Sequence, residues 1–247
     1  MKKEDFKTFI AKYSLGGCVS KVKWKYISSE KKLHTRSTAN NRSFIVDVIM
    51  NDFSELGSED LLICIGDTER VEKMLSPFSE DITLSVNKIG DRILGFTISD
   101  PDCESYCTAA DPTSMDPVPK NLQDIPEYHV IIPLTTEIID KFLKSRMALK
   151  DLSLFSVGMN KKGLFEIVIG YTTSNSNRIR ITPKTDPTYN KLKNSLSFPM
   201  ENVYEVLKSN QDMENGVLSI NESGILKLAY ENPKYSCTYY QFCNKKV

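Results

Sequence analysis

The sequence lacks the features that identify many binding proteins. Its 247 residues carry 32 basic and 32 acidic side chains, so no net charge indicates a nucleic acid or an acidic substrate as partner. Long apolar runs are also absent, since none approaches the ~20 residues that cross a bilayer, and charges interrupt the first residues too often for a signal peptide. We therefore expect a cytoplasmic protein with no membrane partner, whose basic surface is local.

Catalytic motifs are missing as well. The chain contains no Walker A glycine loop, no H-E-x-x-H, no G-x-S-x-G and no G-x-G-x-x-G sequence. The only histidines are His34 and His129, and each lies in a strand-like run, which favours a structural role over a general base. We predict that the protein is not an enzyme and needs no cofactor. A hydrolase that uses carboxylates alone is the remaining enzymatic alternative.

Cysteine is moderately abundant, but its pattern is not that of a disulfide framework. Six cysteines in a chain of this length, without a secretory signal, are typical of reduced thiols. Cys103 and Cys107, together with Cys237 and Cys243, offer four sulfur atoms for zinc, but three and five intervening residues are loose spacings for such a site. We predict reduced thiols and no metal.

Four segments repeat apolar residues at helical spacing. Their apolar stripes begin at residues 6, 71, 138 and 200, so they recur at intervals of 65, 67 and 62 residues. Short runs of β-branched and aromatic residues, bounded by turn residues, lie between them. The pattern predicts an α+β fold of four helix-plus-strands units, arranged as two similar halves.

A proline-rich segment lies between these halves. AADPTSMDPVPKNLQDIPE, residues 109–127, holds four of the eleven prolines and no glycine. Because proline removes a backbone donor and fixes φ, this segment predicts an extended connector. The sequence therefore predicts an N-terminal domain over 1–108, a connector over 109–127 and a C-terminal domain over 128–247.

The order and spacing of these elements resemble the DNA polymerase sliding clamps, in particular the T-even tailed-phage type, which is related to proliferating cell nuclear antigen. The resemblance covers nearly the whole chain. Its most specific piece is TAADPTSMDPVP, which is similar to the alanine–aspartate–proline sequence that opens the connector of the phage clamps. FLKSRMALKDLSLFSV and the closing GVLSINESGILKLAYENPKYSCTYYQF are also similar to the family. The chain departs from it by its neutral charge and by helical periodicity that begins at Phe6, where the family usually has a strand first.

The resemblance implies a DNA clamp fold of two similar domains, each with two helices on one face of antiparallel sheets. It implies a homotrimeric ring that encircles duplex DNA without sequence preference, tethers the DNA polymerase and is placed on DNA by a clamp loader. Lys and Arg contacts to phosphates hold the duplex in such a ring. A monomeric DNA-binding processivity subunit, or a structural phage protein on the same scaffold, is the alternative.

Basic residues of three predicted helices are candidates to face DNA. Lys141 and Lys144 lie opposite the apolar stripe of the third helix and are the best of them. Arg146 resembles a basic residue at the end of this helix in the family, although an unbroken helix turns it toward the apolar face. The other candidates are Lys7, Lys12, Arg70 and Lys73. A solvated helix face is the alternative for every one, and the fourth helix is expected to expose Asn202 instead of a cation.

The resemblance also implies a pocket beside the connector, in which partner peptides bury apolar anchors. Its candidate residues are Met115, Val118, Leu122, Ile125 and Phe242. The four connector residues among them could instead pin the connector to the sheets beneath, and both roles remain open.

Ring closure in the family pairs one edge strand from each half, because an exposed edge is an association site. The candidates for this subunit interface are Cys103, Tyr106, Thr108, Arg178, Ile179, Arg180 and Ile181.

The sequence KVKWK places Lys21, Lys23 and Lys25 on one face of a predicted strand and Trp24 on the other. Basic residues with interleaved aromatics could bind nucleic acid. A half-buried strand with a lysine-rich outer face produces the same pattern and is favoured, with Trp24 in the core.

Overall fold

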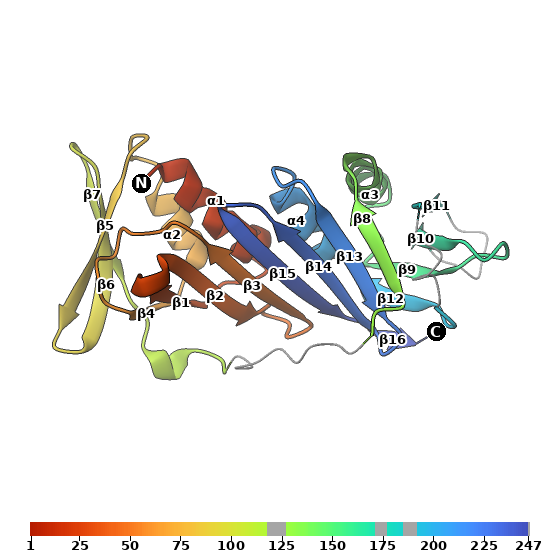
Figure 1. The fold of residues 1–247 in the computed structure, drawn as a ribbon, viewed down its shortest axis with the longest axis horizontal. Coiled ribbons are helices and arrows are strands. Elements are labelled where there is room, and N and C mark those ends of the chain that lie inside the picture. Colours follow the sequence, from red (N-terminus) through yellow and green to blue (C-terminus); the bar gives the residue numbers. More distant parts are fainter. Residues whose placement is uncertain (118–126, 171–176, 185–191, 247) are drawn as a thin grey trace. The chain divides into compact units, whose positions relative to one another are not determined.

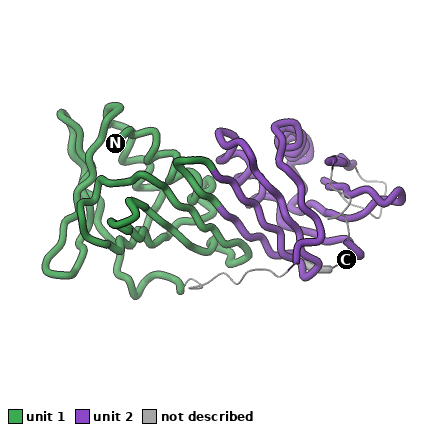
Figure 2. The backbone as a smooth tube through the Cα atoms, in the orientation of Figure 1, with its two compact units in different colours: residues 1–120, 232–237 green, residues 121–231, 238–247 purple. Residues whose placement is uncertain are grey.

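The computed structural model describes residues 1–117, 127–170, 177–184 and 192–246. The chain forms two compact units, residues 1–120 with 232–237 and residues 121–231 with 238–247 (Figure 2). Each unit carries two α-helices and antiparallel sheets, as predicted for the α+β class. Residues 109–117 of the predicted connector belong to the first unit, whereas residues 118–126 lie outside the described ranges.

The first unit places its helices and sheets in the order that the apolar periodicity predicted (Figure 1). Strands β4-β1-β2-β3 are neighbours in one sheet, and β5-β6-β7 form a second. The helices are α1 (Lys3–Ser14) and α2 (Thr68–Met74), and the short 3-10 turns are η1 (Leu15–Gly17), η2 (Ser28–Glu30) and η3 (Pro112–Ser114). The strands are β1 (Val22–Ile27), β2 (Lys32–Thr38), β3 (Phe44–Met50), β4 (Leu61–Ile65), β5 (Thr83–Ile89), β6 (Arg92–Ser99) and β7 (Glu104–Thr108).

Trp24 is the centre of the core of the first unit. Its side chain is 1% exposed, and its ring lies 5.4 Å from Phe6 of α1 and 5.2 Å from Phe96 of β6. The indole Nε1–H donates a hydrogen bond to the Tyr13 hydroxyl at 3.2 Å, which satisfies the polar atom of a buried ring. One residue therefore joins α1 to both sheets, and its predicted place in the core is confirmed.

Within the described residues, only one bridged position precedes the first helix. Lys2 forms an isolated bridge with Asp81, and the amide of Ile82 donates to the Met1 carbonyl at 2.9 Å. α1 begins at Lys3, directly after this bridge. The early start of helical periodicity in the sequence thus agrees with a helix that begins directly after this bridged position.

The second unit repeats the plan of the first. Strands β11-β10-β9-β12-β16 form one sheet, and β15-β14-β13-β8 are neighbours in another. The helices are α3 (Thr136–Ala148) and α4 (Met200–Ser209). The strands are β8 (Val130–Leu134), β9 (Leu154–Met159), β10 (Phe165–Gly170), β11 (Arg178–Ile181), β12 (Leu196–Pro199), β13 (Gly216–Asn221), β14 (Ile225–Glu231), β15 (Tyr235–Phe242) and β16 (Lys245–Lys246). β12 is not predicted from the sequence, because a four-residue run that ends in proline is too short to show an alternating pattern.

Asp100 joins two loops of the first unit. Its carboxylate accepts hydrogen bonds from the backbone N–H groups of Ser79 at 2.6 Å, Asp102 at 3.0 Å and Cys103 at 2.7 Å. These bonds stabilise the charged form, with that from Ser79 contributing most, and they lower the pKa of Asp100 from 3.8 to about 2. The carboxylate thus holds the loop after α2 against the turn between β6 and β7.

We expect Asp100→Asn to destabilise the protein in a pH-dependent way. Because the folded-state pKa is depressed, the stabilisation is present above the ordinary value of 3.8 and is lost as the pH falls toward about 2. Urea unfolding from neutral pH down to this window should show a difference between wild type and Asp100→Asn that shrinks on acidification. Asp102→Asn in the same turn is the matched control, and a difference that stays constant with pH would contradict the assignment.

Candidate nucleic-acid interface

Helix α3 presents the two best candidate lysines to solvent. The Thr135 hydroxyl caps the helix by accepting a hydrogen bond from the Ile138 amide at 3.3 Å, and Ile139 and Phe142 form its buried face. Lys141 and Lys144 extend from the opposite side and are 57% and 78% exposed. Their exposure allows the contact with phosphate that the resemblance implies.

Each of these lysines has an acidic partner one turn earlier in the helix. Lys141 Nζ lies 2.5 Å from a Glu137 oxygen, and Lys144 Nζ lies 3.4 Å from Asp140. These partners were not predicted, although their i, i+4 spacing in the sequence is a signal for such pairs. The outer face of α3 is therefore a row of exposed ion pairs.

The same arrangement recurs on the helices of the first unit. Lys73 of α2 pairs with Glu69 at 2.6 Å, and Lys7 of α1 lies 3.9 Å from Glu4. Arg70 is exposed on α2, where its backbone amide donates to the capping Asp67 carboxylate at 2.9 Å. Three predicted DNA-facing residues of this unit thus lie on exposed helix surface.

Lys12 was wrongly assigned to the DNA-facing set. Its side chain is 0% exposed, and Nζ lies 5.3 Å from the centroid of the Tyr235 ring. A cation over the face of an aromatic ring is attracted by the ring quadrupole, which offsets part of the cost of burial. The helical wheel of α1 does not reveal this burial, because Tyr235 comes from the far end of the chain.

Arg146 and Asn202 also have structural contacts. α3 continues past Arg146, whose guanidinium lies 3.1 Å from Glu201 of α4 and donates to the Lys150 carbonyl at 2.5 Å, so only 20% of the side chain is exposed. Asn202 was expected on the surface of α4 but is buried, where its amide donates to the Gln241 side chain at 2.9 Å. Both residues hold α4 in place within the second unit.

The predicted interface residues lie on two strands that end their sheets, except Cys103, which directly precedes β7. Among the described strands, β7 is last in the order β5-β6-β7 and β11 is last in β11-β10-β9-β12-β16. Tyr106 and Thr108 of β7 are exposed, as are Arg178 and Arg180 of β11, while Cys103 and Ile179 are half-buried. Ile181 is the exception, since its side chain is 5% exposed and points into the core, so only its backbone is left for an edge contact.

Two of the five residues predicted for the peptide pocket, Met115 and Phe242, lie in the described ranges. Met115 is buried and, with Asp116, lines a cavity of about 200 Å³ beside Lys21 and Lys23 in the first unit. Phe242 at the end of β15 is 37% exposed. Val118, Leu122 and Ile125 lie outside the described residues, so their roles as pocket rim or as connector anchors stay a prediction.

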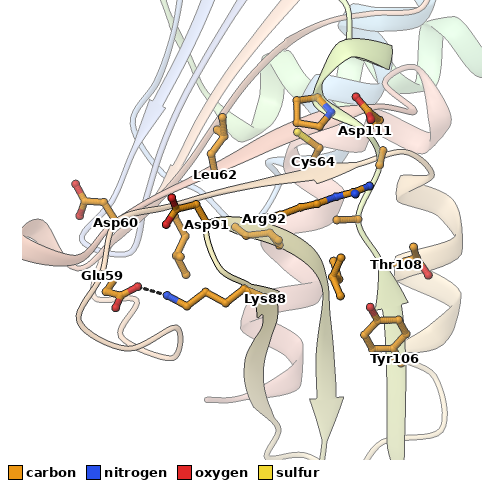
Figure 3. Close-up of a pocket in the computed structure, with 16 residues that line it drawn as sticks. Glu59, Asp60, Leu62, Cys64, Lys88, Asp91, Arg92, Tyr106, Thr108 and Asp111 are labelled. Atoms are coloured by element: carbon orange, nitrogen blue, oxygen red, sulfur yellow. Dashed lines mark hydrogen bonds and ion pairs between the residues drawn. The ribbon is translucent and has the colours of Figure 1, made fainter.

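A larger cavity of about 720 Å³ lies in the first unit, between β4, the β5–β6 hairpin and the start of the connector. Leu62 and Tyr106 supply apolar surface, and Arg92 extends toward Asp111 (Figure 3). Lys88 and Glu59 form an ion pair at its mouth. No local sequence pattern predicts this cavity, because it is assembled from three separate segments.

Both histidines make hydrogen bonds within the fold. His34 Nε2 lies 2.6 Å from Asp47, which also binds Arg36. Burial opposes ionisation of Asp47, but the hydrogen bonds and charges of His34 and Arg36 outweigh it and lower the pKa of this carboxyl. His129 Nδ1 receives a hydrogen bond from the Glu222 amide at 3.3 Å. These contacts give both residues the structural roles that their strand positions indicated.

All six cysteines are free thiols, and burial raises the pKa of the Cys107 thiol to about 11. In the described parts of the chain, no three His, Cys, Asp or Glu side chains gather as a metal site would require. Within those same ranges, no helix combines the length and apolar character of a membrane crossing.

No protein-family model matches the sequence, and no curated protein does either. Solved clamp structures match over nearly the full length. Proliferating cellular nuclear antigen from Entamoeba histolytica has a TM-score of 0.74 at 15% identity, with 99% of this chain and 97% of that chain covered. The A. fulgidus homologue bound to the C-terminal region of FEN-1 has a TM-score of 0.74 at 15% identity, with 100% and 98% covered. A chain of the PCNA2–PCNA3 complex from Sulfolobus tokodaii has a TM-score of 0.67 at 12% identity, with 99% and 97% covered. The chain therefore has the sliding-clamp fold, as predicted.

Proposed function

We propose that the protein is a sliding clamp, a homotrimeric ring that encircles duplex DNA and tethers a DNA polymerase without enzymatic activity. The observation that carries the proposal is the match of both units, in one chain, to clamp structures with a TM-score of 0.74. We also propose that the clamp is of the T-even tailed-phage type, that a clamp loader places it on DNA, and that it works in the cytoplasm of a host cell. The similarity of TAADPTSMDPVP to the connector of the phage clamps supports the phage type, and the other two follow from that type.

The paired helix lysines suit a ring that must slide. A phosphate has to compete with Glu137 for Lys141 and with Asp140 for Lys144. Exposed ion pairs of this kind contribute only ~0–1 kcal/mol, so a lysine exchanges one anion for another at little cost. Such contacts carry no sequence information and weaken with salt, which keeps the duplex loosely held.

Partner binding is proposed at the connector. The A. fulgidus structure holds the C-terminal region of FEN-1, which shows that a chain with this fold binds a segment of another protein. In our chain, Met115, Val118, Leu122, Ile125 and Phe242 are proposed to receive such a segment. A short peptide gains affinity by burying a few apolar anchors in a pocket.

Two measurements test the ring. Light scattering over a range of concentrations should give the mass of a trimer, and protein loaded on circular DNA should be retained until the circle is cut, after which it slides off. A monomeric processivity subunit predicts the monomer mass and equal retention on linear and circular DNA. A strict monomer that does not distinguish the two DNA forms would remove the ring proposal.

Reversing the charge of Lys141 and Lys144 is expected to weaken DNA retention several-fold at low salt, because two phosphate contacts per subunit become repulsive. The double variant Glu137→Gln and Asp140→Asn is the matched control. It should have the opposite effect and strengthen DNA retention, because it frees both lysines from their acidic partners. Retention on circular DNA at several salt concentrations measures both. Unchanged retention in both variants would remove α3 from the DNA-facing surface.

A further inference from the structure

Three lysines, two in β1 and one directly before it, lie on the face of the sheet that is opposite the core of the first unit. In β1, Val22, Trp24 and Tyr26 are buried, whereas Lys23 is half-buried and Lys25 is exposed on the other face. Lys21 precedes the strand and is exposed. Alternate residues of a strand are ~6.6–6.8 Å apart, so Lys21, Lys23 and Lys25 form a straight line of charges, which we call the lysine row.

The lysine row differs from the helix surfaces in its charge balance. Lys141, Lys144 and Lys73 each have an acidic partner within 4 Å. No ion pair joins any member of the lysine row to a carboxylate in the described part of the chain. The row is therefore a positive strip in which no lysine is held in an ion pair by the described residues of its own unit.

The neighbouring strands β2 and β4 place no unpaired carboxylate beside the lysine row. On β4, Cys64 is the register partner of Lys23 and Leu62 that of Lys25. On β2, His34 is the partner of Lys25, and the nearest carboxylate beyond it, Asp47, binds His34 and Arg36. The two neighbouring strands thus flank the row with neutral or already paired groups, and Asp111 of the first unit acts on Cys64 together with Lys23.

A carboxylate lies near each end of the lysine row and limits the length of its positive surface. Hydrogen bonds from the Ser28 backbone and side chain, aided by the charge of Lys25, lower the pKa of Asp60 and keep it ionised at one end. At the other end, Asp116 shares a cavity of about 200 Å³ with Lys21 and Lys23. Because these acids lie at the two ends of the strip, they limit its length, and the strip suits a short anionic segment that lies along β1.

We propose that the lysine row binds an extended acidic segment of a partner protein, with carboxylates at alternate residues that match the spacing of the row. A duplex fits less well, because its major groove alone is ~12 Å wide and its phosphates would reach the bounding acids. Single strands gain affinity by stacking bases on aromatics, but Trp24 and Tyr26 are buried on the opposite face. This inference does not depend on ring closure or on the proposed function.

The test measures binding of labelled peptides to the full chain by fluorescence anisotropy. The probe is a peptide of four Glu-Ser repeats, and a Gln-Ser peptide and a short DNA duplex are the comparison ligands. The row variant is Lys21→Glu, Lys23→Glu and Lys25→Glu together. The matched control is Lys161→Glu, Lys162→Glu and Lys193→Glu, which reverses three exposed charges elsewhere.

The wild type and the control should bind the Glu-Ser peptide in preference to the Gln-Ser peptide at low salt. The row variant should bind it at least about tenfold more weakly, because three contacts are reversed together. A triple Lys→Gln variant gives the same test with a smaller perturbation if the Glu variant unfolds. Equal binding by wild type and row variant, or absence of binding by wild type, would overturn the proposal. Row-dependent binding of duplex without row-dependent binding of peptide would overturn it in favour of nucleic acid.

Discussion

Replacing Arg178 and Arg180 with glutamate is expected to convert the proposed trimer into monomers. Both side chains are exposed on β11, which ends its sheet among the described strands, and Ile179 lies between them. The opposing edge in the proposed ring is β7, which carries the exposed Glu104 and the 48% exposed Tyr106. In the proposed ring, the wild-type edges would combine backbone pairing with opposite charges, whereas the variant would place like charges together.

The expected effect is large because it recurs at every interface of a closed ring. Close charge pairs across interfaces couple by ~1.5–7 kcal/mol, and ~1.4 kcal/mol changes an equilibrium tenfold, so the subunit dissociation constant should rise by a factor of at least about 100. Light scattering across a dilution series measures it. Retention on circular DNA should fall in parallel.

Two further variants make this result specific. Lys161→Glu with Lys162→Glu reverses two exposed charges in the turn between β9 and β10 of the same sheet and should leave the trimer intact. Adding Glu104→Lys to the double arginine variant should restore part of the association, because opposite charges again face each other. A trimer that persists in Arg178→Glu with Arg180→Glu would remove β11 from the proposed interface.

Trp24→Ala is expected to cause the largest loss of folding stability. The indole is 1% exposed and contacts Phe6, Phe9, Tyr13 and Phe96 through its ring. Truncation of a buried Trp leaves a cavity and typically costs ~3–5 kcal/mol, which is a large share of the ~5–15 kcal/mol that stabilises a folded domain. It also leaves the Tyr13 hydroxyl without the indole donor.

Urea unfolding followed by circular dichroism measures this loss, since the substitution removes the only tryptophan. Lys25→Ala, the next residue on the exposed face of β1, is the matched control and should change the unfolding free energy by no more than ~0.5 kcal/mol. Trp24→Phe should fall between the two, because it keeps an aromatic ring but loses the N–H donor. A loss below about 1 kcal/mol for Trp24→Ala would contradict the central place of this residue in the core.

The sequence by itself determined where the helices lie and what class of fold they build. α1, α2, α3 and α4 all begin within a few residues of the apolar stripes that predicted them. The placement of Trp24 in the core followed from the alternation in KVKWK. These features were readable because helical and strand periodicities are local, and a buried face leaves its repeat in consecutive residues.

Only the tertiary structure decided which polar side chains are available on that frame. Lys12 lies against Tyr235, Arg146 against Glu201 and Asn202 against Gln241, and each partner is remote in sequence or on another element. Strand order likewise showed that β7 and β11 end their sheets among the described strands. A long charged side chain is exposed or buried according to the neighbours that folding brings to it, and a helical wheel contains no record of those neighbours.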